Sequence, residues 1–246
     1  MTFSSKIKDE LSRTEIADAA SAEAEVAAFV RTVGYITIKG MNKVEFEFAT
    51  ENAAVARRIF RVLKTAYDIN ATVSVSKSNR LKKQNNYIIK IDESTTKKLL
   101  VDTQIVKNND FNIVSFNYEV PEELLHSDLC KRAYIKGSFM GSGSISNPER
   151  SYHAEFVSNR EIQSKTLQVL LKGYGISGKN IYRKNNYVTY VKESEQISDL
   201  LALMGANNAV LNFENIRAIK ETRNQINRVI NCETANLDKI VDTSMR

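Results

Sequence analysis

The chain has 246 residues, 42% of them apolar, and carries a formal net charge of +6 with a pI near 9.1. This length and apolar content allow one large or two modest folded domains and exclude a disordered or fibrous chain. No apolar run is long enough to cross a bilayer, and the first residues lack the apolar core of a secretion signal. We therefore expect a cytoplasmic protein without membrane contact.

Hydrophobic periodicity predicts one order of helices and strands that occurs twice. In the first half we expect a helix at 4–14 capped by Ser4 or Ser5, a helix at 22–33, strands at 35–39 and 43–50 turning at 40–42, a helix at 52–67, strands at 71–76 and 87–92, and a helix at 95–106. Residues 111–129 form a linker, and residues 130–204 repeat the order. The first two strands alternate cleanly, which predicts that Ile36, Ile38, Val44, Phe46 and Phe48 point to one face.

The duplication is visible in the sequence itself. The segment 25–37, EVAAFVRTVGYIT, is a faded copy of 131–146, KRAYIKGSFMGSGSIS. Phe48 in the first copy corresponds to Phe156 in the second, 108 residues later, and Tyr87 corresponds to Tyr187, 100 residues later. The drop in spacing fits a shorter hairpin loop in the second copy. A collinear match interrupted by one loop change indicates an internal repeat.

Each copy begins with a helix that ends at a glycine and passes directly into a strand. Small residues give both helices a face that another helix backbone can approach closely. The residues expected at this helix interface are Ala27, Val33, Gly34, Gly137, Gly141, Ser142 and Gly143. We expect the terminal glycines to supply left-handed caps. For either copy taken alone, an ordinary amphipathic helix with a C-terminal glycine is the simpler explanation of the pattern.

The doubled helix-to-strand motif resembles the LAGLIDADG homing-endonuclease fold. More closely, the stretches 131–139, 143–149 and 151–153, with the late runs 223–228 and 231–236, are similar to the WhiA family of bacterial regulators. The resemblance implies an α+β, pseudo-twofold domain built from two helix-strand-strand-helix-strand-strand-helix repeats, followed by a long helix. It also implies the ranges 1–110 (first helix and first repeat), 111–129 (linker), 130–206 (second repeat) and 207–246 (helical segment leading toward a helix-turn-helix module that this sequence lacks).

The resemblance implies that an active LAGLIDADG nuclease has an acidic residue just before the glycine of each motif helix. This chain departs from that pattern at both positions. Here those positions hold Val33 and Ser142, and neither supplies a carboxylate oxygen to magnesium. We therefore expect no catalytic residue, no metal ion, no cofactor and no enzyme activity. An active DNA endonuclease remains the alternative, and a divalent ion held by other carboxylates would favour it.

Other groups with chemical potential are isolated in the sequence. His126 and His153 have no acid or nucleophile partner by spacing, so local structural roles are expected. Cys130 and Cys232 lie in separate segments without a CxxC motif, which predicts two buried or half-buried thiols and no disulfide or zinc site. We expect no small-molecule substrate.

The positive net charge favours an anionic partner such as nucleic acid. The sheet faces opposite the helices are expected to carry Thr37, Lys39, Glu45, Glu47, Ser74, Ser76 and Lys90 in the first copy, and His153, Glu155 and Tyr182 in the second. The acids weaken these faces for phosphate. The candidate nucleic-acid contacts are basic residues of two hairpins: Lys77, Arg80, Lys82 and Lys83, with Lys179, Arg183 and Lys184. Solubility alone also explains basic hairpin tips.

The segment 213–246 has helical spacing throughout. Its apolar stripe consists of Ile216, Ile219, Ile226, Ile230, Leu237, Ile240 and Val241. Another side offers candidate contacts to a partner or a DNA-binding module: Arg223, Asn224, Asn227, Arg228, Asn231 and Asn236. Asparagine disfavours helix interiors, so its abundance suggests contacts that offset the cost, although a solvated face with several caps is equally compatible.

The family resemblance implies a DNA-binding transcription regulator of cell division, chromosome segregation and sporulation, in the cytoplasm and associated with the nucleoid. It would contact DNA mainly through the helix-turn-helix module and would have a protein partner in the transcription machinery. This chain would then be a catalytically inactive scaffold and interaction region. A pure protein-interaction domain without DNA contact is a further alternative.

Overall fold

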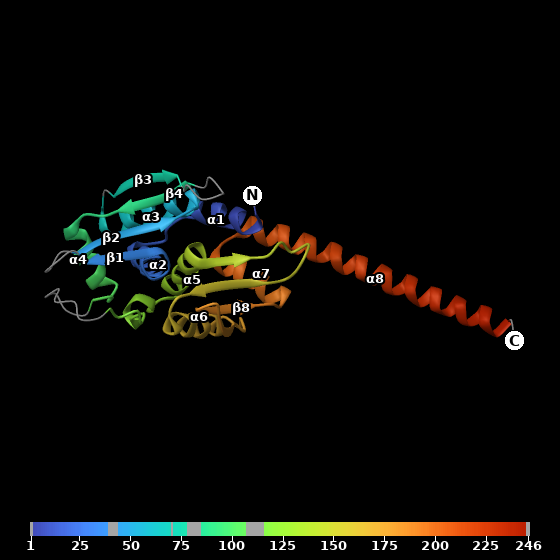
Figure 1. The fold of residues 1–246 in the computed structure, drawn as a ribbon. Helices are drawn as coiled ribbons and strands as arrows, with labels where there is room; N and C mark the ends of the chain where they lie inside the picture. The colour runs from blue at the N-terminus through green and yellow to red at the C-terminus, as the bar shows by residue number, and fades with distance from the viewer. Residues whose placement is uncertain (1, 39–43, 70, 78–84, 107–115, 245–246) are drawn as a thin grey trace.

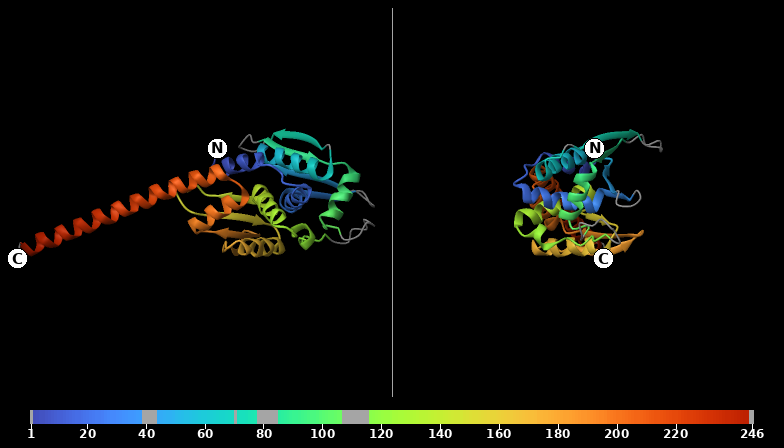
Figure 2. Two further views of the ribbon diagram at one scale, coloured as in Figure 1. Left: turned by 180° about the vertical axis from the view of Figure 1, so that it is seen from behind. Right: turned by 90° about the vertical axis from the view of Figure 1, so that its left-hand side faces the viewer.

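The computed structural model describes residues 2–38, 44–69, 71–77, 85–106 and 116–244. Two four-stranded antiparallel sheets lie on opposite sides of a layer of helices, and one long helix leaves this body and carries the C-terminus far from it (Figure 1). The N-terminus lies close to the point where the long helix leaves the body (Figure 2).

The first repeat and the helix before it follow the predicted order. Its elements are α1 (Phe3–Arg13), α2 (Ala19–Val33), β1 (Gly34–Ile38), β2 (Val44–Thr50), α3 (Ala53–Tyr67), β3 (Thr72–Lys77), β4 (Asn85–Lys90) and α4 (Glu93–Asp102). The strands are ordered β1-β2-β4-β3, and each neighbouring pair is antiparallel.

The second repeat has the same strand order, β5-β6-β8-β7. After the short helix η1 (Glu122–Leu125) in the predicted linker, its elements are α5 (Asp128–Ser142), β5 (Gly143–Ile145), β6 (Ala154–Ser158), α6 (Glu161–Gly173), β7 (Lys179–Arg183), β8 (Asn186–Val191) and α7 (Ser194–Met204), and α8 (Asn207–Ser244) follows. The predicted α+β fold, a duplicated unit followed by a long helix, is confirmed. The predicted turn at 40–42 lies outside the described residues.

Local sequence explains where the helices begin. Asp18 accepts a hydrogen bond from the Ser21 backbone N–H at 2.7 Å, while the Ser21 hydroxyl receives the Asp18 N–H, so a capping box starts α2. The side chains of Asn52 and Ser127 cap α3 and α5 by accepting backbone N–H groups of the first turn, without the reciprocal bond of a capping box. Along α3, the buried positions Val55, Ile59, Val62 and Leu63 follow the helical repeat and face the core, as predicted.

Two local predictions are wrong, those of the α1 cap and of Cys232. Thr2, and neither Ser4 nor Ser5, caps α1, because the Ser4 hydroxyl instead exchanges hydrogen bonds of 2.7 Å with the backbone of Ile145 on β5. Ile38 lies in register with Val44 and so shares its face, as predicted, although it is 53% exposed at the end of its strand. Cys130 is buried as expected, but Cys232 is exposed on α8.

The helix α1 contacts both repeats and the start of α8. The Ser4 hydroxyl of α1 donates a hydrogen bond to β5, and the Ser12 carbonyl accepts one from Arg61 of α3. The Glu10 side chain caps the start of α8. The two Glu10 oxygens accept the backbone N–H groups of Asn208 and Ala209 at 2.7 and 3.0 Å, which suits the positive end of a helix dipole. The base of α8 is thus fixed to the body, while the domain boundaries given above stay a prediction.

The chain between the repeats is held by a buried arginine. Arg31 of α2 donates to the backbone carbonyls of Thr103, Tyr118 and Glu119 at 2.8, 3.1 and 2.7 Å. Burial lowers the pKa of this guanidinium, although the surrounding carbonyls satisfy its donors. Gln163 of α6 donates to the Arg31 carbonyl at 3.0 Å, so the same residue also joins the second repeat to α2.

Candidate functional site

The centre of the molecule is the contact between α2 and α5, which we call the helix seam. A Cβ added at Gly137 would lie 2.9 Å from both the Glu25 carbonyl oxygen and the Ala28 Cβ, and one at Gly141 would lie 2.1 Å from the Thr32 hydroxyl. Only glycine allows this approach, and Ala27 is fully buried on the facing helix. The predicted close packing of the two motif helices is therefore present.

The terminal glycines serve a different purpose from the one predicted. Gly34 and Gly143 both have a φ of −84°, in extended backbone, so neither is a left-handed cap. A Cβ at Gly34 would lie 2.4 Å from the Val30 carbonyl oxygen, and one at Gly143 would lie 2.3 Å from the Phe139 ring. The glycines are needed because each helix turns directly into its strand and leaves no room for a side chain.

The ends of the seam carry no carboxylate at the two motif positions. Val33 is 8% exposed and belongs to the core, and the Ser142 hydroxyl donates to the Ser138 carbonyl at 3.2 Å within its own helix. Among the described residues, no three His, Cys, Asp or Glu side chains come together as a metal-binding group. The side chains at these positions are an alkyl group and a hydroxyl that is already engaged.

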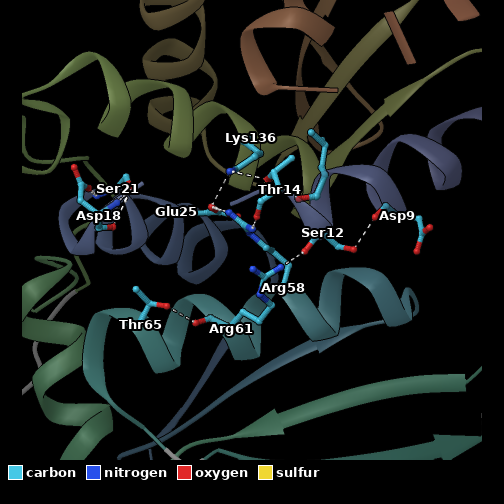
Figure 3. A network of polar contacts seen from close by, with 11 residues as sticks. Asp9, Ser12, Thr14, Asp18, Ser21, Glu25, Arg58, Arg61, Thr65 and Lys136 are labelled. Carbon is cyan, nitrogen blue, oxygen red and sulfur yellow. Dashed lines mark hydrogen bonds and ion pairs between the residues drawn. The ribbon is translucent and has the colours of Figure 1, made fainter. Parts of the chain in front are cut away.

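A buried ionic network beside the seam was missed by sequence reasoning (Figure 3). Glu25 of α2 is 1% exposed, and its two oxygens accept hydrogen bonds of 2.7 Å from Nε and Nη2 of Arg58 on α3. Lys136 of α5 lies 3.3 Å from the same carboxylate, and Arg58 also donates to the Thr14 carbonyl. The three charged residues join three helices of both repeats.

In this network the Glu25 carboxylate is held by two cations, Arg58 and Lys136. Burial lowers the pKa of Lys136, and the charge of Glu25 opposes that shift. Glu25 accepts a bidentate pair from a guanidinium, the geometry in which carboxylates are held most firmly. A signal was available in the sequence, since Arg58 stands beside Ile59 within the apolar stripe of α3 and must be paired when buried.

The outer sheet faces were expected to be weakened by acids, and the register places most of the predicted residues there. Glu47 lies 3.6 Å from Lys90 on β4, and Glu155, its counterpart by the repeat, lies 3.7 Å from Arg183 on β7. His153 lies 3.3 Å from Glu155 and stacks on Tyr190, so it does have an acidic neighbour, contrary to our expectation. The acids thus offset cations on the same faces.

Tyr182 lies on the other face from the one expected, and part of the first hairpin is outside the described residues. Tyr182 pairs with Tyr187 and so shares the face of the buried Phe156. Lys77 is the last residue of β3, in register with Asn85. The candidates Arg80, Lys82 and Lys83, and Lys39, lie outside the described residues.

The second hairpin has the short turn that the repeat predicted. Lys184 and Asn185 have φ values of 51° and 61°, the pattern of a two-residue type I′ turn between β7 and β8. All five residues of β7 are exposed, so Lys179, Arg183 and Lys184 are accessible at this end. Whether these cations contact nucleic acid stays a prediction.

The helix α8 divides into a packed base and a free extension. Phe213 is fully buried and its ring centroid lies 5.6 Å from that of Tyr152, while Lys220 donates to the Pro148 carbonyl at 3.1 Å. From 221 onward every described side chain is exposed. The candidate contacts Arg223, Asn224, Asn227, Arg228, Asn231 and Asn236 all lie on this extension.

Comparisons with known proteins agree with this architecture. Residues 131–223 match the family model described as the WhiA LAGLIDADG-like domain, and residues 19–106 match the WhiA N-terminal LAGLIDADG-like domain. The chain is 47% identical to a probable cell division protein WhiA of Clostridium tetani and 44% identical to that of Clostridium acetobutylicum, covering all of this chain and 77% and 78% of those proteins.

Solved structures show the same fold. A full-length DUF199/WhiA from Thermatoga maritima superposes with a TM-score of 0.70 at 19% identity, covering 97% of this chain and 74% of that one. The homing endonuclease I-DmoI, solved in complex with DNA and manganese, superposes with a TM-score of 0.52 at 10% identity, covering 76% and 98%. Within the described residues no helix has both the length and the apolar character needed to span a membrane.

Proposed function

Because the chain belongs to the WhiA family, we propose that it is the catalytically silent LAGLIDADG-like region of a DNA-binding regulator of transcription in cell division, chromosome segregation and sporulation. In this proposal the chain is no enzyme and needs no cofactor. Its repeats form a scaffold, α8 leads toward a helix-turn-helix module, and the domain ranges are those given from the sequence. The relatives are named as cell division proteins, which supports this assignment.

The observation that carries the proposal is the chemistry at the ends of the seam. Cleavage of a phosphodiester with magnesium requires hard oxygen ligands that place the ion against the scissile phosphate. Val33 supplies none, and the Ser142 hydroxyl is neutral and donates within its own helix. Glu25 offers no replacement, because Arg58 and Lys136 already hold its carboxylate in the interior.

The sheet surfaces support a modest role in DNA contact. Nonspecific affinity for DNA follows the number of phosphates that cations neutralise, and here Lys90 and Arg183 each lie beside a carboxylate. We therefore assign the main DNA contact to the helix-turn-helix module and a flanking contact to Lys179, Arg183 and Lys184. A protein partner in the transcription machinery, a cytoplasmic location and association with the nucleoid complete the proposal.

A cleavage assay tests the catalytic part of the proposal. The 246-residue chain is incubated with supercoiled plasmid and with a library of duplex targets, in magnesium or manganese, beside an EDTA control. We expect no specific cleavage with either metal. A discrete cut that disappears with EDTA, and whose rate falls for the Ser142→Ala variant, would reject catalytic silence.

A second candidate, an interaction domain without DNA contact, is favoured by the exposed apolar side chains of α8 and by the paired charges on the sheets. Measurement of DNA affinity against salt separates the two. If the second hairpin contacts phosphate, replacing Lys179, Arg183 and Lys184 by Gln lowers the affinity and flattens the salt dependence.

The matched control is Lys165→Gln on α6, which removes a cation from the helix-covered side of the same repeat. We expect this control to bind DNA as the unmodified chain does. Equal affinity of the hairpin variant and the control, or no binding of any of them at low salt, would favour the interaction domain.

A further inference from the structure

The extension of α8 exposes a continuous row of large apolar side chains. Ile219, Ile226, Ile230, Leu237 and Ile240 are between 52% and 64% exposed, and the half-buried Ile216 begins the row where the helix leaves the body. A free helix of this composition gains little from propensity, because isoleucine and asparagine are weak helix formers. An apolar row of this length is typical of a surface that another chain covers.

The spacing of the row is that of a coiled coil. Starting at Ile216, alternate steps of three and four residues reach Ile219, Arg223, Ile226, Ile230, Glu233, Leu237 and Ile240. These are successive a and d positions of a heptad repeat, extending over about 36 Å of helix. We call them the α8 seam. Its two charged members, Arg223 and Glu233, are exposed and form no ion pair within the described residues.

The order of residues along the α8 seam is symmetric about Arg228. If a second copy runs antiparallel around this centre, each a position faces a d position: Ile216 faces Ile240, Ile219 faces Leu237, Arg223 faces Glu233, and Ile226 faces Ile230. Every apolar residue meets an apolar one, and each charge meets its opposite. A parallel pair would instead place Arg223 against Arg223 and Glu233 against Glu233, which is repulsive.

We propose that the α8 extensions of two copies of this chain pair as an antiparallel coiled coil centred at Arg228, with Arg223 of each copy facing Glu233 of the other. The two bodies then lie at opposite ends of the pair, because α8 projects away from its body (Figures 1 and 2).

The flanking positions are compatible with this arrangement. Those on one side of the α8 seam are Lys220, Asn227, Thr234 and Val241, and those on the other are Thr222, Val229, Asn236 and Thr243. Lys220 alone is charged, and it is already engaged with Pro148 and the Tyr152 ring at the base of the helix. No like charges therefore oppose the pairing, and the valines widen the apolar contact.

Sedimentation equilibrium of the 246-residue chain over a wide concentration range tests the pairing. We expect a monomer–dimer equilibrium that Arg223→Glu and Glu233→Arg each weaken by tenfold or more, because each change sets like charges opposite one another. The double variant restores the dimer, since its charges are complementary only in the antiparallel register. Mixing the two single variants also restores it, because one chain then carries two acids and the other two bases at these positions.

The matched control is Arg228→Glu, which makes the same charge reversal on the side away from the α8 seam and should leave the dimer unchanged. Orientation is tested independently by disulfide formation in a Cys232→Ser background. A chain carrying Ile226→Cys should crosslink to one carrying Ile230→Cys, and neither should crosslink efficiently to itself.

A chain that is monomeric at every concentration overturns the proposal. A dimer that the single reversals leave intact, or that the double reversal does not restore, overturns the antiparallel register. Crosslinks between two Ile226→Cys chains in preference to the mixed pair would indicate the parallel arrangement instead.

Discussion

The molecule contains two helix surfaces that are made for contact with another helix, and they are built on opposite principles. At the helix seam, glycine and alanine let the backbones of α2 and α5 approach closely, and the adjoining charges are buried and paired. On α8 the contact residues are large isoleucine and leucine side chains, and the charged side chains of Arg223 and Glu233 are exposed to solvent.

The difference shows which surface is part of folding and which remains open. Small residues give a contact that tolerates no added atoms, so the two helices of the helix seam can pack in only one way inside the folded body. Large apolar residues at heptad spacing form a contact that can be made and separated without unfolding the body. The first surface should respond to substitution with loss of stability, and the second with loss of association.

The largest expected loss of stability comes from breaking the buried ion pair beside the helix seam. Arg58→Met leaves the Glu25 carboxylate in the interior with Lys136 as its remaining cation, which should lower the free energy of unfolding by about 4 kcal/mol. Urea denaturation measures this change. The matched control is the adjacent Arg57→Met, which removes an exposed pair with Asp9 and should cost less than about 1 kcal/mol. Equal effects of the two variants would contradict the assigned role.

A smaller loss of stability is expected when a side chain is added at the helix seam. Gly137→Val introduces atoms against the Glu25 carbonyl and the Ala28 methyl, and should lower the free energy of unfolding by about 2 to 3 kcal/mol. In Gly173→Ala the new methyl meets nothing within 4 Å, so this control should be neutral or slightly stabilising. A neutral Gly137→Val would show that the helices separate without penalty.

A third prediction concerns Lys8, which packs against α5 and forms no ion pair with any carboxylate of the described residues. Lys8 of α1 lies 5.8 Å from the centre of the Phe139 ring, and burial lowers its pKa from 10.5 to about 8. The unfolded chain binds more protons between these values, so this lysine makes stability rise with pH from about 8 to 10.5.

The Lys8→Met variant isolates this contribution. Its advantage over the unmodified chain should be greatest below pH 8 and should shrink by on the order of 1 to 2 kcal/mol as the pH rises to 10.5. Lys6→Met, at an exposed position of the same helix, is the control. A stability difference for Lys8→Met that does not change with pH would contradict the prediction.

The smallest effect on stability is expected on α8. Leu237→Gln removes an exposed apolar residue far from the body, so the unfolding of the body, followed by tyrosine fluorescence, should change by less than about 0.5 kcal/mol. The same variant should weaken association if α8 pairs as proposed. A large loss of stability in the body would mean that the two helix surfaces are not separate in the way described.

The sequence predicted the features that depend on local pattern. Small residues in two collinear copies indicated the close contact of α2 and α5, and strand alternation placed Phe46 and Phe48 in the core. The position of the first helix cap was ambiguous, because Thr2, Ser4 and Ser5 are all capable caps and only contact with β5 decides how Ser4 is used.

The features that were missed depend on distant partners. Glu25 is 33 residues from Arg58 in sequence, and no local pattern shows that Lys136 joins them. The glycines before β1 and β5 were correctly singled out but wrongly explained, because their sequence position is the same for a left-handed cap and for a crowded extended residue. The proposed lack of activity and the basic hairpin contacts rest on chemistry that the fold alone leaves open.

The extended glycines have one mechanical consequence. Since Gly34 and Gly143 are at once the end of a helix and the first residue of a strand, no loop absorbs motion between α2 and β1 or between α5 and β5. A small rotation of one seam helix against the other must swing the two sheets through a similar angle. The curvature of the surface that the two sheets form therefore depends on a single contact, that between α2 and α5.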